Sequence, residues 1–117
     1  MSMHPPSYME WMLLRGALRL LILALLEDSI MQGYQVVKHV ESLIGEKPSL
    51  STIYTILSNL EKEGFIKSLR GETKRYMITE RGRALLRRIR SESKSRILKL
   101  IHRILGIEDG INLQRAL

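Results

Sequence analysis

Five short side chains that form hydrogen bonds gather on one side of a predicted helix over residues 50–63. At 100° per residue, these side chains lie opposite the apolar residues of the helix or along its flanks. A solvated helix face usually carries long charged side chains, whereas this one carries small hydroxyl and amide groups that allow a close approach to another surface. The five residues are Ser51, Thr52, Thr55, Ser58 and Asn59.

The apolar residues of the same stretch recur at helical spacing and predict an amphipathic helix that packs on a core. The hydroxyl of Ser49 is placed to accept from the free N–H groups of the first turn. Gly64 fits the left-handed position that ends a helix. The predicted apolar face consists of Leu50, Ile53, Ile56, Leu57 and Leu60.

A basic hairpin is predicted directly after this helix. Residues 65–69 and 74–78 are rich in apolar and aromatic side chains, and the turn-type segment 70–73 contains Gly71. A helix with a short polar outer face followed by a basic hairpin predicts a winged helix-turn-helix. In that fold the helix enters the major groove of DNA and the hairpin reaches backbone phosphates. The basic residues are Lys67, Arg70, Lys74 and Arg75.

Two further helices are predicted before the turn at residues 45–48. Ser7-x-x-Glu10 has the pattern of a capping box, which predicts a helix from Tyr8 to about Leu26. Ser29-x-x-Gln32 has the same pattern and predicts the start of a second helix, which ends at Gly45. This second helix is the first helix of the helix-turn-helix.

Four further residues of the helix-turn-helix are candidates for contact with DNA, and two of them have an alternative role in packing. Gln35 and Lys38 are placed to reach phosphates, as first helices of such motifs often do. Tyr34 is either part of that phosphate-facing turn or a core or interface residue. Tyr54 either contacts a base or phosphate near the start of its helix or packs against the wing.

Several segments resemble the PadR family of transcriptional regulators. Residues 15–26 are similar to the first helix of that family, and the resemblance extends over about residues 14–90. One departure is Thr55, where many members have proline after the tyrosine. The matching motifs are Gly33-Tyr34, Ser49-x-x-Thr52-Ile53-Tyr54, Leu57-x-x-Leu60-Glu61-x-Glu63-Gly64 and Lys74-Arg75-Tyr76-x-Ile78-Thr79-Glu80-x-Gly82.

The resemblance implies a homodimeric, sequence-specific regulator of double-stranded DNA, most simply a repressor that occludes a promoter. It also implies a possible partner in a small aromatic effector, and it implies neither a cofactor nor a metal. Two alternatives are a winged-helix protein-interaction module and a non-specific nucleoid-type protein. The predicted DNA-binding residues are Gln35, Lys38, Ser49, Ser51, Thr52, Tyr54, Thr55, Ser58, Asn59, Lys67, Arg70, Lys74 and Arg75.

A long last helix is predicted from its N-cap at Thr79 to a stop at Gly106. An apolar seam runs along it with one polar interruption at Ser93, and its far half extends beyond the rest of the domain. We therefore expect this half to pack on a second chain. The apolar patch near Trp11 is covered either by a partner helix or by local core packing. The predicted dimer-interface residues are Trp11, Leu14, Leu86, Ile89, Ile97, Leu100 and Ile104.

The positive charge is concentrated in the C-terminal third. Residues 1–78 hold 9 Lys and Arg against 8 Asp and Glu, whereas residues 79–117 hold 10 against 4. The basic residues of the last helix flank its seam and are either solvated or, for Arg81 and Arg83 in the first turns, in contact with phosphate. Residues 107–117, with Ile111, Leu113 and Leu117, form either a short terminal helix or a frayed tail.

The fold class is predicted as mainly α with a small two-stranded β wing. A DNA-binding part at residues 1–78 and a dimerisation helix and tail at residues 79–117 are predicted to form one compact unit.

The sequence also bears on the compartment and on whether the protein is an enzyme. The chain has no cysteine and no signal-peptide pattern at its start, which favours the cytoplasm. No catalytic motif is present, and the three histidines, His4, His39 and His102, are isolated, which argues against an enzyme.

Overall fold

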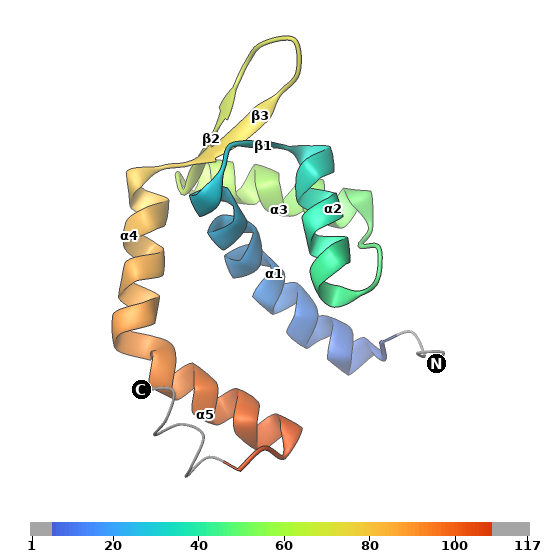
Figure 1. The fold of residues 1–117 in the computed structure, drawn as a ribbon, viewed down its shortest axis with the longest axis vertical. Helices are drawn as coiled ribbons and strands as arrows, with labels where there is room; N and C mark the ends of the chain where they lie inside the picture. The colour runs from blue at the N-terminus through green and yellow to red at the C-terminus, as the bar shows by residue number, and fades with distance from the viewer. Residues whose placement is uncertain (1–5, 109–117) are drawn as a thin grey trace. The chain divides into compact units, whose positions relative to one another are not determined.

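The structure is a computed structural model, and it describes residues 6–108, which form two compact units, residues 6–83 and residues 84–108. His4 and the predicted tail residues Ile111, Leu113 and Leu117 lie outside the described residues. Three helices and a small sheet make up the first unit (Figure 1). The elements in chain order are α1 (Tyr8–Asp28), β1 (Met31–Gln32), α2 (Gly33–Ile44), α3 (Leu50–Lys62), β2 (Ile66–Leu69) and β3 (Arg75–Ile78), followed by α4 (Glu80–Arg88), a π-helical segment η1 (Ile89–Ser93) and α5 (Lys94–Leu105).

The three helices of the first unit pack around one apolar core. The buried residues of α1 all lie in its second half, from Leu18 to Leu26. In α3, Ile53, Ile56, Leu57 and Leu60 are buried as predicted, whereas Leu50 is 49 % exposed because it lies at the first residue of the helix, before the core begins. The remaining core residues of this unit are Met31, Val36, Val37, Val40, Ile66, Tyr76 and Ile78.

The wing forms a three-stranded antiparallel sheet, one strand more than predicted. Strand β3 lies in the middle, with β2 on one side and the short β1 on the other. Met31 pairs with Tyr76, and Lys67 pairs with Met77. The hairpin between β2 and β3 projects beyond the helices, as Figure 1 shows. The fold is the predicted winged helix-turn-helix, with the hairpin anchored to the chain segment that precedes α2.

The predicted capping patterns are confirmed at some helix ends and wrong at others. Ser7 and Glu10 form the capping box of α1, with both hydrogen bonds at 3.3 Å. The second predicted box is wrong, because Ser29 closes α1 and residues 31–32 enter the sheet. Helix α2 therefore begins at Gly33, and the side chain of Gln35 accepts the Gln32 N–H at 2.8 Å.

The two ends of α3 also differ. Ser49 occupies the N-cap position, but its hydroxyl pairs with the Ser51 hydroxyl at 2.8 Å rather than with a backbone N–H. At the other end Gly64 has a φ of 82°, and the Phe65 N–H donates to the Leu60 carbonyl at 3.0 Å. This is a Schellman motif, which fixes the direction in which the chain leaves α3 for the wing.

Gly82 lies where the first turn of α4 approaches the end of α3. The Thr79 hydroxyl caps α4 by accepting the Gly82 N–H at 3.2 Å, and it donates to the Gly64 carbonyl at 2.6 Å. A Cβ atom at Gly82 would lie 2.3 Å from the Phe65 carbonyl oxygen. Only glycine fits this position without a backbone shift.

The predicted single long helix is interrupted. It begins at Glu80 and ends at Gly106, which has a φ of 72°, but residues 89–93 form a π-helix between α4 and α5. Figure 1 shows the change of direction between the two helices. A π-helix has more residues in each turn than an α-helix. The apolar seam predicted from the sequence therefore does not continue along one straight helix.

Candidate nucleic-acid interface

The outer face of α3 carries the small polar side chains in an exposed position. Ser51, Thr55 and Ser58 are exposed, while Thr52 and Asn59 are half-buried on one flank. A shallow groove of about 510 Å³ runs along this face from Ser51 to Lys62. The face is therefore open along its length to a partner surface.

Tyr54 lies on the opposite flank of α3 and packs against the start of α2. A Cβ atom at Gly33 would lie 2.6 Å from the hydroxyl oxygen of Tyr54 and 2.6 Å from its Cε1 atom. Tyr54 thus packs against Gly33 and not against the wing, and its contact with a base or phosphate stays a prediction. The ring remains 45 % exposed, so its outer edge also faces solvent beside the polar residues of α3.

The basic and polar residues of α2 already have neighbours within the chain. Lys38 Nζ lies 5.6 Å from the centre of the Tyr34 ring and 3.6 Å from a carboxylate oxygen of Glu41. Tyr34, and after it Glu41, raise the pKa of Lys38 above its usual value. Tyr34 is 56 % exposed and is not a core residue. Gln35 is exposed and uses its side-chain oxygen to cap α2.

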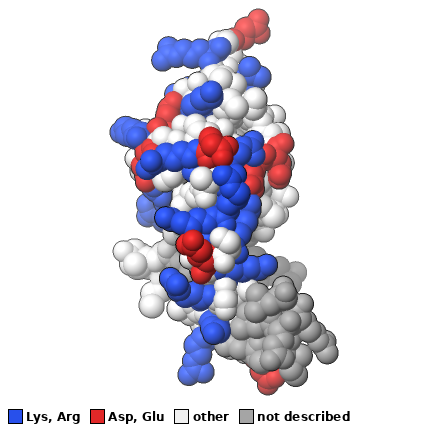
Figure 2. All heavy atoms as spheres, turned by 90° about the vertical axis from the view of Figure 1, so that its left-hand side faces the viewer, with Lys and Arg blue, Asp and Glu red and all other residues white. Residues whose placement is uncertain are grey.

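The wing presents its four basic side chains to solvent. All four are exposed, and within residues 6–108 none of them forms an ion pair. Lys74 Nζ lies 5.4 Å from the centre of the Tyr76 ring. At the top of Figure 2, blue side chains lie along the wing, beside one red side chain at its very tip. The residues are Lys67, Arg70, Lys74 and Arg75.

Two hydrogen-bonded links hold the wing against the helices. Gln32 Nε2 donates to the Thr73 hydroxyl at 2.9 Å, which joins the chain before α2 to the hairpin. The Ser68 hydroxyl and N–H both donate to the same carboxylate oxygen of Glu61, at 2.6 and 3.2 Å. The wing is thus oriented with respect to both α2 and α3.

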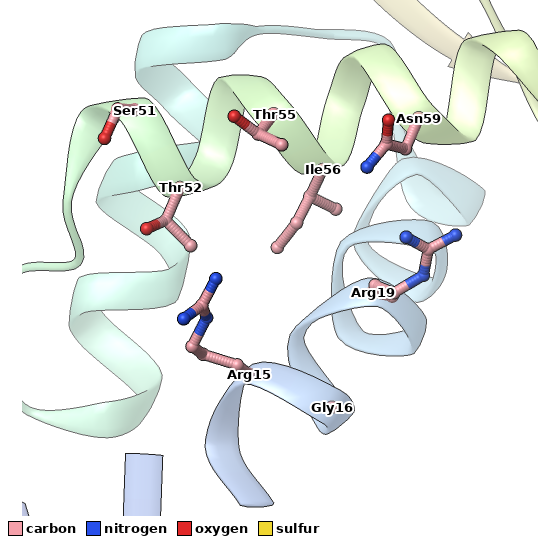
Figure 3. A pocket seen from close by; sticks show the side chains of 8 residues that line it. All are labelled: Arg15, Gly16, Arg19, Ser51, Thr52, Thr55, Ile56 and Asn59. Atoms are coloured by element: carbon pink, nitrogen blue, oxygen red, sulfur yellow. The ribbon is translucent and has the colours of Figure 1, made fainter. Parts of the chain in front are cut away.

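Two arginines of α1 lie beside α3 and were not among the predicted site residues. Arg15, Arg19 and the Thr52–Asn59 flank of α3 line a cleft of about 430 Å³. Figure 3 shows the Arg15 guanidinium pointing toward Thr52 and Ile56, and the Arg19 side chain pointing toward Asn59. The spacing of four residues between the arginines, which puts both on one helix face, was the available sequence signal.

A second pocket of about 310 Å³ lies between the N-terminal half of α1 and the start of α3. Tyr8, Trp11 and Met12 form its apolar wall. Its polar groups come from Arg15, Ser49 and Thr52, with Pro48 beside them. The pocket combines an aromatic surface with a guanidinium.

The predicted dimer residues differ widely in exposure. Trp11, Leu14 and Ile89 are half-buried, and Leu86 is already buried within a single chain. Leu86 therefore offers little surface to a second chain. The residues in α5 are open to solvent, with Ile97 at 41 %, Leu100 at 62 % and Ile104 at 55 % exposed.

One arginine in the first turn of α4 contacts an aromatic ring of the same chain. The Arg81 guanidinium lies 5.0 Å from the centre of the Phe65 ring, and the residue is exposed. Arg83 is half-buried. Stacking on an aromatic ring leaves the N–H groups of a guanidinium free to donate.

Metal sites and membrane spans need recognisable arrangements of residues, and residues 6–108 contain neither. No group of three or more His, Asp or Glu side chains there is arranged to hold a metal ion. In the same residues, none of the helices combines the length and the apolar character needed to cross a membrane.

The fold and this surface define a winged helix-turn-helix protein of the DNA-binding class. The family model described as "Transcriptional regulator PadR-like family" matches residues 22–88. The chain belongs to the PadR-like family. It is a DNA-binding regulator of transcription and not an enzyme.

Solved structures agree with this assignment, while no curated protein matches the chain. A transcriptional regulator from Clostridium thermocellum is 26 % identical, with a TM-score of 0.68 over 87 % of this chain and 96 % of that one. A PadR family regulator from Clostridium difficile is 27 % identical, with a TM-score of 0.66 over 77 % and 99 %. A PadR family regulator from Eggerthella lenta is 26 % identical, with a TM-score of 0.67 over 86 % and 91 %.

Proposed function

We propose that this protein is a sequence-specific repressor that binds double-stranded DNA as a homodimer. The observation that carries the proposal is the exposed face of short polar side chains on α3, beside a wing whose basic side chains form no ion pair within the described residues. A helix of this kind fits the major groove, and a basic hairpin fits the adjacent backbone.

Base reading is assigned to the outer face of α3. The hydroxyls of Ser51 and Ser58 donate to or accept from base edges, and the methyl group of Thr55 can meet a thymine methyl. Thr52 and Asn59 reach the same groove from the flank. Tyr54 and Ser49 lie at the start of the helix, where the edge of the Tyr54 ring and the Ser49 hydroxyl are positioned for the backbone.

Phosphate contacts are assigned to the wing and to α2. Lys67, Arg70, Lys74 and Arg75 position the wing along the backbone. Lys38 and the amide of Gln35 contact phosphates from the first half of α2. Lys38 is charged in the physiological range, as lysines are, and its raised pKa does not change this. These contacts fix orientation without reading sequence.

Dimerisation is assigned to residues 79–117 and to the N-terminal half of α1, and DNA binding to residues 1–78. Exposed apolar side chains support both parts of the dimer interface, with Met12 at 59 % exposed in α1 and Leu100 at 62 % in α5. A two-fold dimer presents two copies of α3, so the operator has two half-sites. Binding over a promoter would exclude RNA polymerase, which makes the protein a repressor in the cytoplasm, where the DNA is.

A small aromatic effector is assigned to the pocket beside Trp11. Its apolar wall and the guanidinium of Arg15 fit an aromatic ring that carries an acidic group. Quenching of Trp11 fluorescence together with a raised melting temperature, in a panel of aromatic acids, is the expected result. Unchanged fluorescence and an unchanged melting temperature across the panel would contradict the assignment of an effector to this pocket.

The test of the main proposal is binding to a labelled duplex from upstream of the gene, compared with a scrambled duplex, over a range of salt concentrations. We expect tight binding to the first duplex alone, two chains per site, and a steep decrease of affinity with salt. Equal binding to both duplexes would identify a non-specific nucleoid-type protein. No binding to either at low salt would favour a protein-interaction module.

A further inference from the structure

We propose that the cleft between α1 and α3 binds a phosphate oxyanion through Arg15 and Arg19. The inference rests on the proposed function, because it assigns α1 a place in the same DNA complex. Two sources share this chemistry, a phosphate of the DNA backbone and a free phosphate ion. The position of the cleft favours the backbone.

The polar lining of the cleft consists of hydrogen-bond donors. It comprises two guanidiniums, the hydroxyls of Ser51, Thr52 and Thr55, and the amide of Asn59, and no carboxylate lines it. Guanidiniums bind phosphate oxygens through two parallel N–H donors, and the two arginines carry this proposal. The volume of about 430 Å³ leaves room for a tetrahedral anion.

The two arginines are available to a ligand. Arg15 is exposed and forms neither a hydrogen bond nor an ion pair within residues 6–108. Arg19 pairs with Glu63 at the end of α3, with the two side chains 39 % and 45 % exposed. An exposed ion pair of this kind contributes little, so a phosphate can replace the carboxylate.

The open space of the cleft comes in part from a glycine. Gly16 lies between the two arginines in sequence and lines the cleft, and a Cβ atom there would meet nothing within 4 Å. A glycine inside a helix has a cost in stability of about 1 kcal/mol relative to alanine. No packing within residues 6–108 requires a glycine here, whereas close approach of a ligand to the helix backbone would.

The position of the cleft beside α3 indicates that the phosphate belongs to the DNA backbone. Tyr54 and Gly33 lie on the flank of α3 that faces α2, while Thr52 and Asn59 lie on the flank that faces α1. A helix in the major groove has a sugar–phosphate backbone on each side. The assigned contacts of α2 serve one side, and Arg15 and Arg19 serve the other.

The experiment compares wild type with the double variant Arg15→Gln/Arg19→Gln on the upstream duplex and a scrambled one. We expect about tenfold weaker binding to both, and a salt slope lower by about 0.9 for each phosphate that the variant no longer neutralises. Arg96→Gln, which removes an exposed charge from α5, should keep the slope. Glu63→Gln breaks the ion pair of Arg19 but leaves its charge, and it should bind at least as tightly as wild type.

A second arm uses inorganic phosphate without DNA. Melting is compared in phosphate and in chloride at equal ionic strength. A rise in melting temperature that the double variant lacks, with an unchanged salt slope, would identify free phosphate as the ligand. A reduced slope without the melting response would identify the DNA backbone.

The inference is overturned if the double variant keeps both the slope and the melting behaviour of wild type. It is also overturned if Arg96→Gln lowers the slope equally, which would show a general effect of net charge, or if Glu63→Gln weakens binding as the arginine variant does. A failure of the proposed function looks different, because wild type would then not prefer the upstream duplex, and Lys74→Gln in the wing would leave the slope unchanged.

Discussion

Helices α3 and α5 are both amphipathic, but they expose opposite faces. In α3 the apolar residues are buried within the chain, with Ile53 and Leu57 at 0 % exposure, and the short polar side chains face outward. In α5 the apolar residues are open, with Leu100 at 62 %. The apolar face of α3 is buried within the chain and its polar face is exposed. Helix α5 instead exposes an apolar face that a second chain can cover.

Leu57→Ala should have the largest effect on this contrast. A fully buried leucine loses its packing and leaves a cavity, so the free energy of unfolding should fall by about 3 kcal/mol. Urea denaturation at fixed protein concentration measures the change. Leu100→Ala is the matched control on α5, and at a protein concentration low enough for the chains to be separate it should change the free energy of unfolding by much less. An equal loss in both variants would contradict the distinction between the two helices.

Ile104→Asp should act on association and leave the fold intact. A carboxylate at a covered apolar position loses its hydration without a partner, so dimerisation should weaken by about 100-fold. Sedimentation velocity reports the association state, and circular dichroism reports the fold. Lys99→Gln, an exposed position of the same helix, serves as the control. If Ile104→Asp remained fully dimeric, the interface would have to lie elsewhere.

Gly33→Ala should disturb the flank of α3 that faces α2. The added methyl group would lie 2.6 Å from the Tyr54 ring, so the ring must move, at a cost of about 2 kcal/mol. Gly16→Ala meets no neighbour and should raise stability by about 1 kcal/mol. Thermal melting of the two variants compares them directly. If the melting temperature shifted in the same direction in both variants, the Tyr54 contact would not contribute to stability.

Ser58→Ala should have the smallest effect, and one confined to recognition. Loss of one hydroxyl contact should change discrimination between operator variants by about 1 kcal/mol, with stability unchanged. Lys74→Ala should instead weaken binding to all sequences and lower the salt slope by about 1. Competition binding with a panel of single-base variants separates the two. A uniform loss in Ser58→Ala would remove that residue from base reading.

Much of the fold could be predicted because local signals agreed with one another. The apolar spacing of α3, the left-handed Gly64 and the Thr79 cap all occur where the pattern placed them. The exposed polar face of α3 and the basic wing followed from the same patterns. Whether they act on DNA bases and phosphates remains a prediction.

The errors have physical causes. Strand β1 has two residues, too few for an alternating pattern, and Ser29 and Gln32 imitate a cap that the sheet makes impossible. The cleft beside α3 was missed because sequence alone does not show which helix faces the arginines of α1. The Tyr54 contact with Gly33 joins residues 21 positions apart in the sequence and leaves no periodic signal.

The π-helix has a consequence for how the apolar stripe of α5 is aimed. One extra residue in a helical turn rotates everything after it by about 100°. Deleting Ser91, in the middle of η1, would therefore swing Leu100 and Ile104 around the helix axis relative to residues 84–88, with no apolar side chain changed. The direction in which α5 can meet a second chain is set by the length of this segment, so a one-residue insertion or deletion would suffice to change the geometry of an assembly and the spacing of the half-sites it reads.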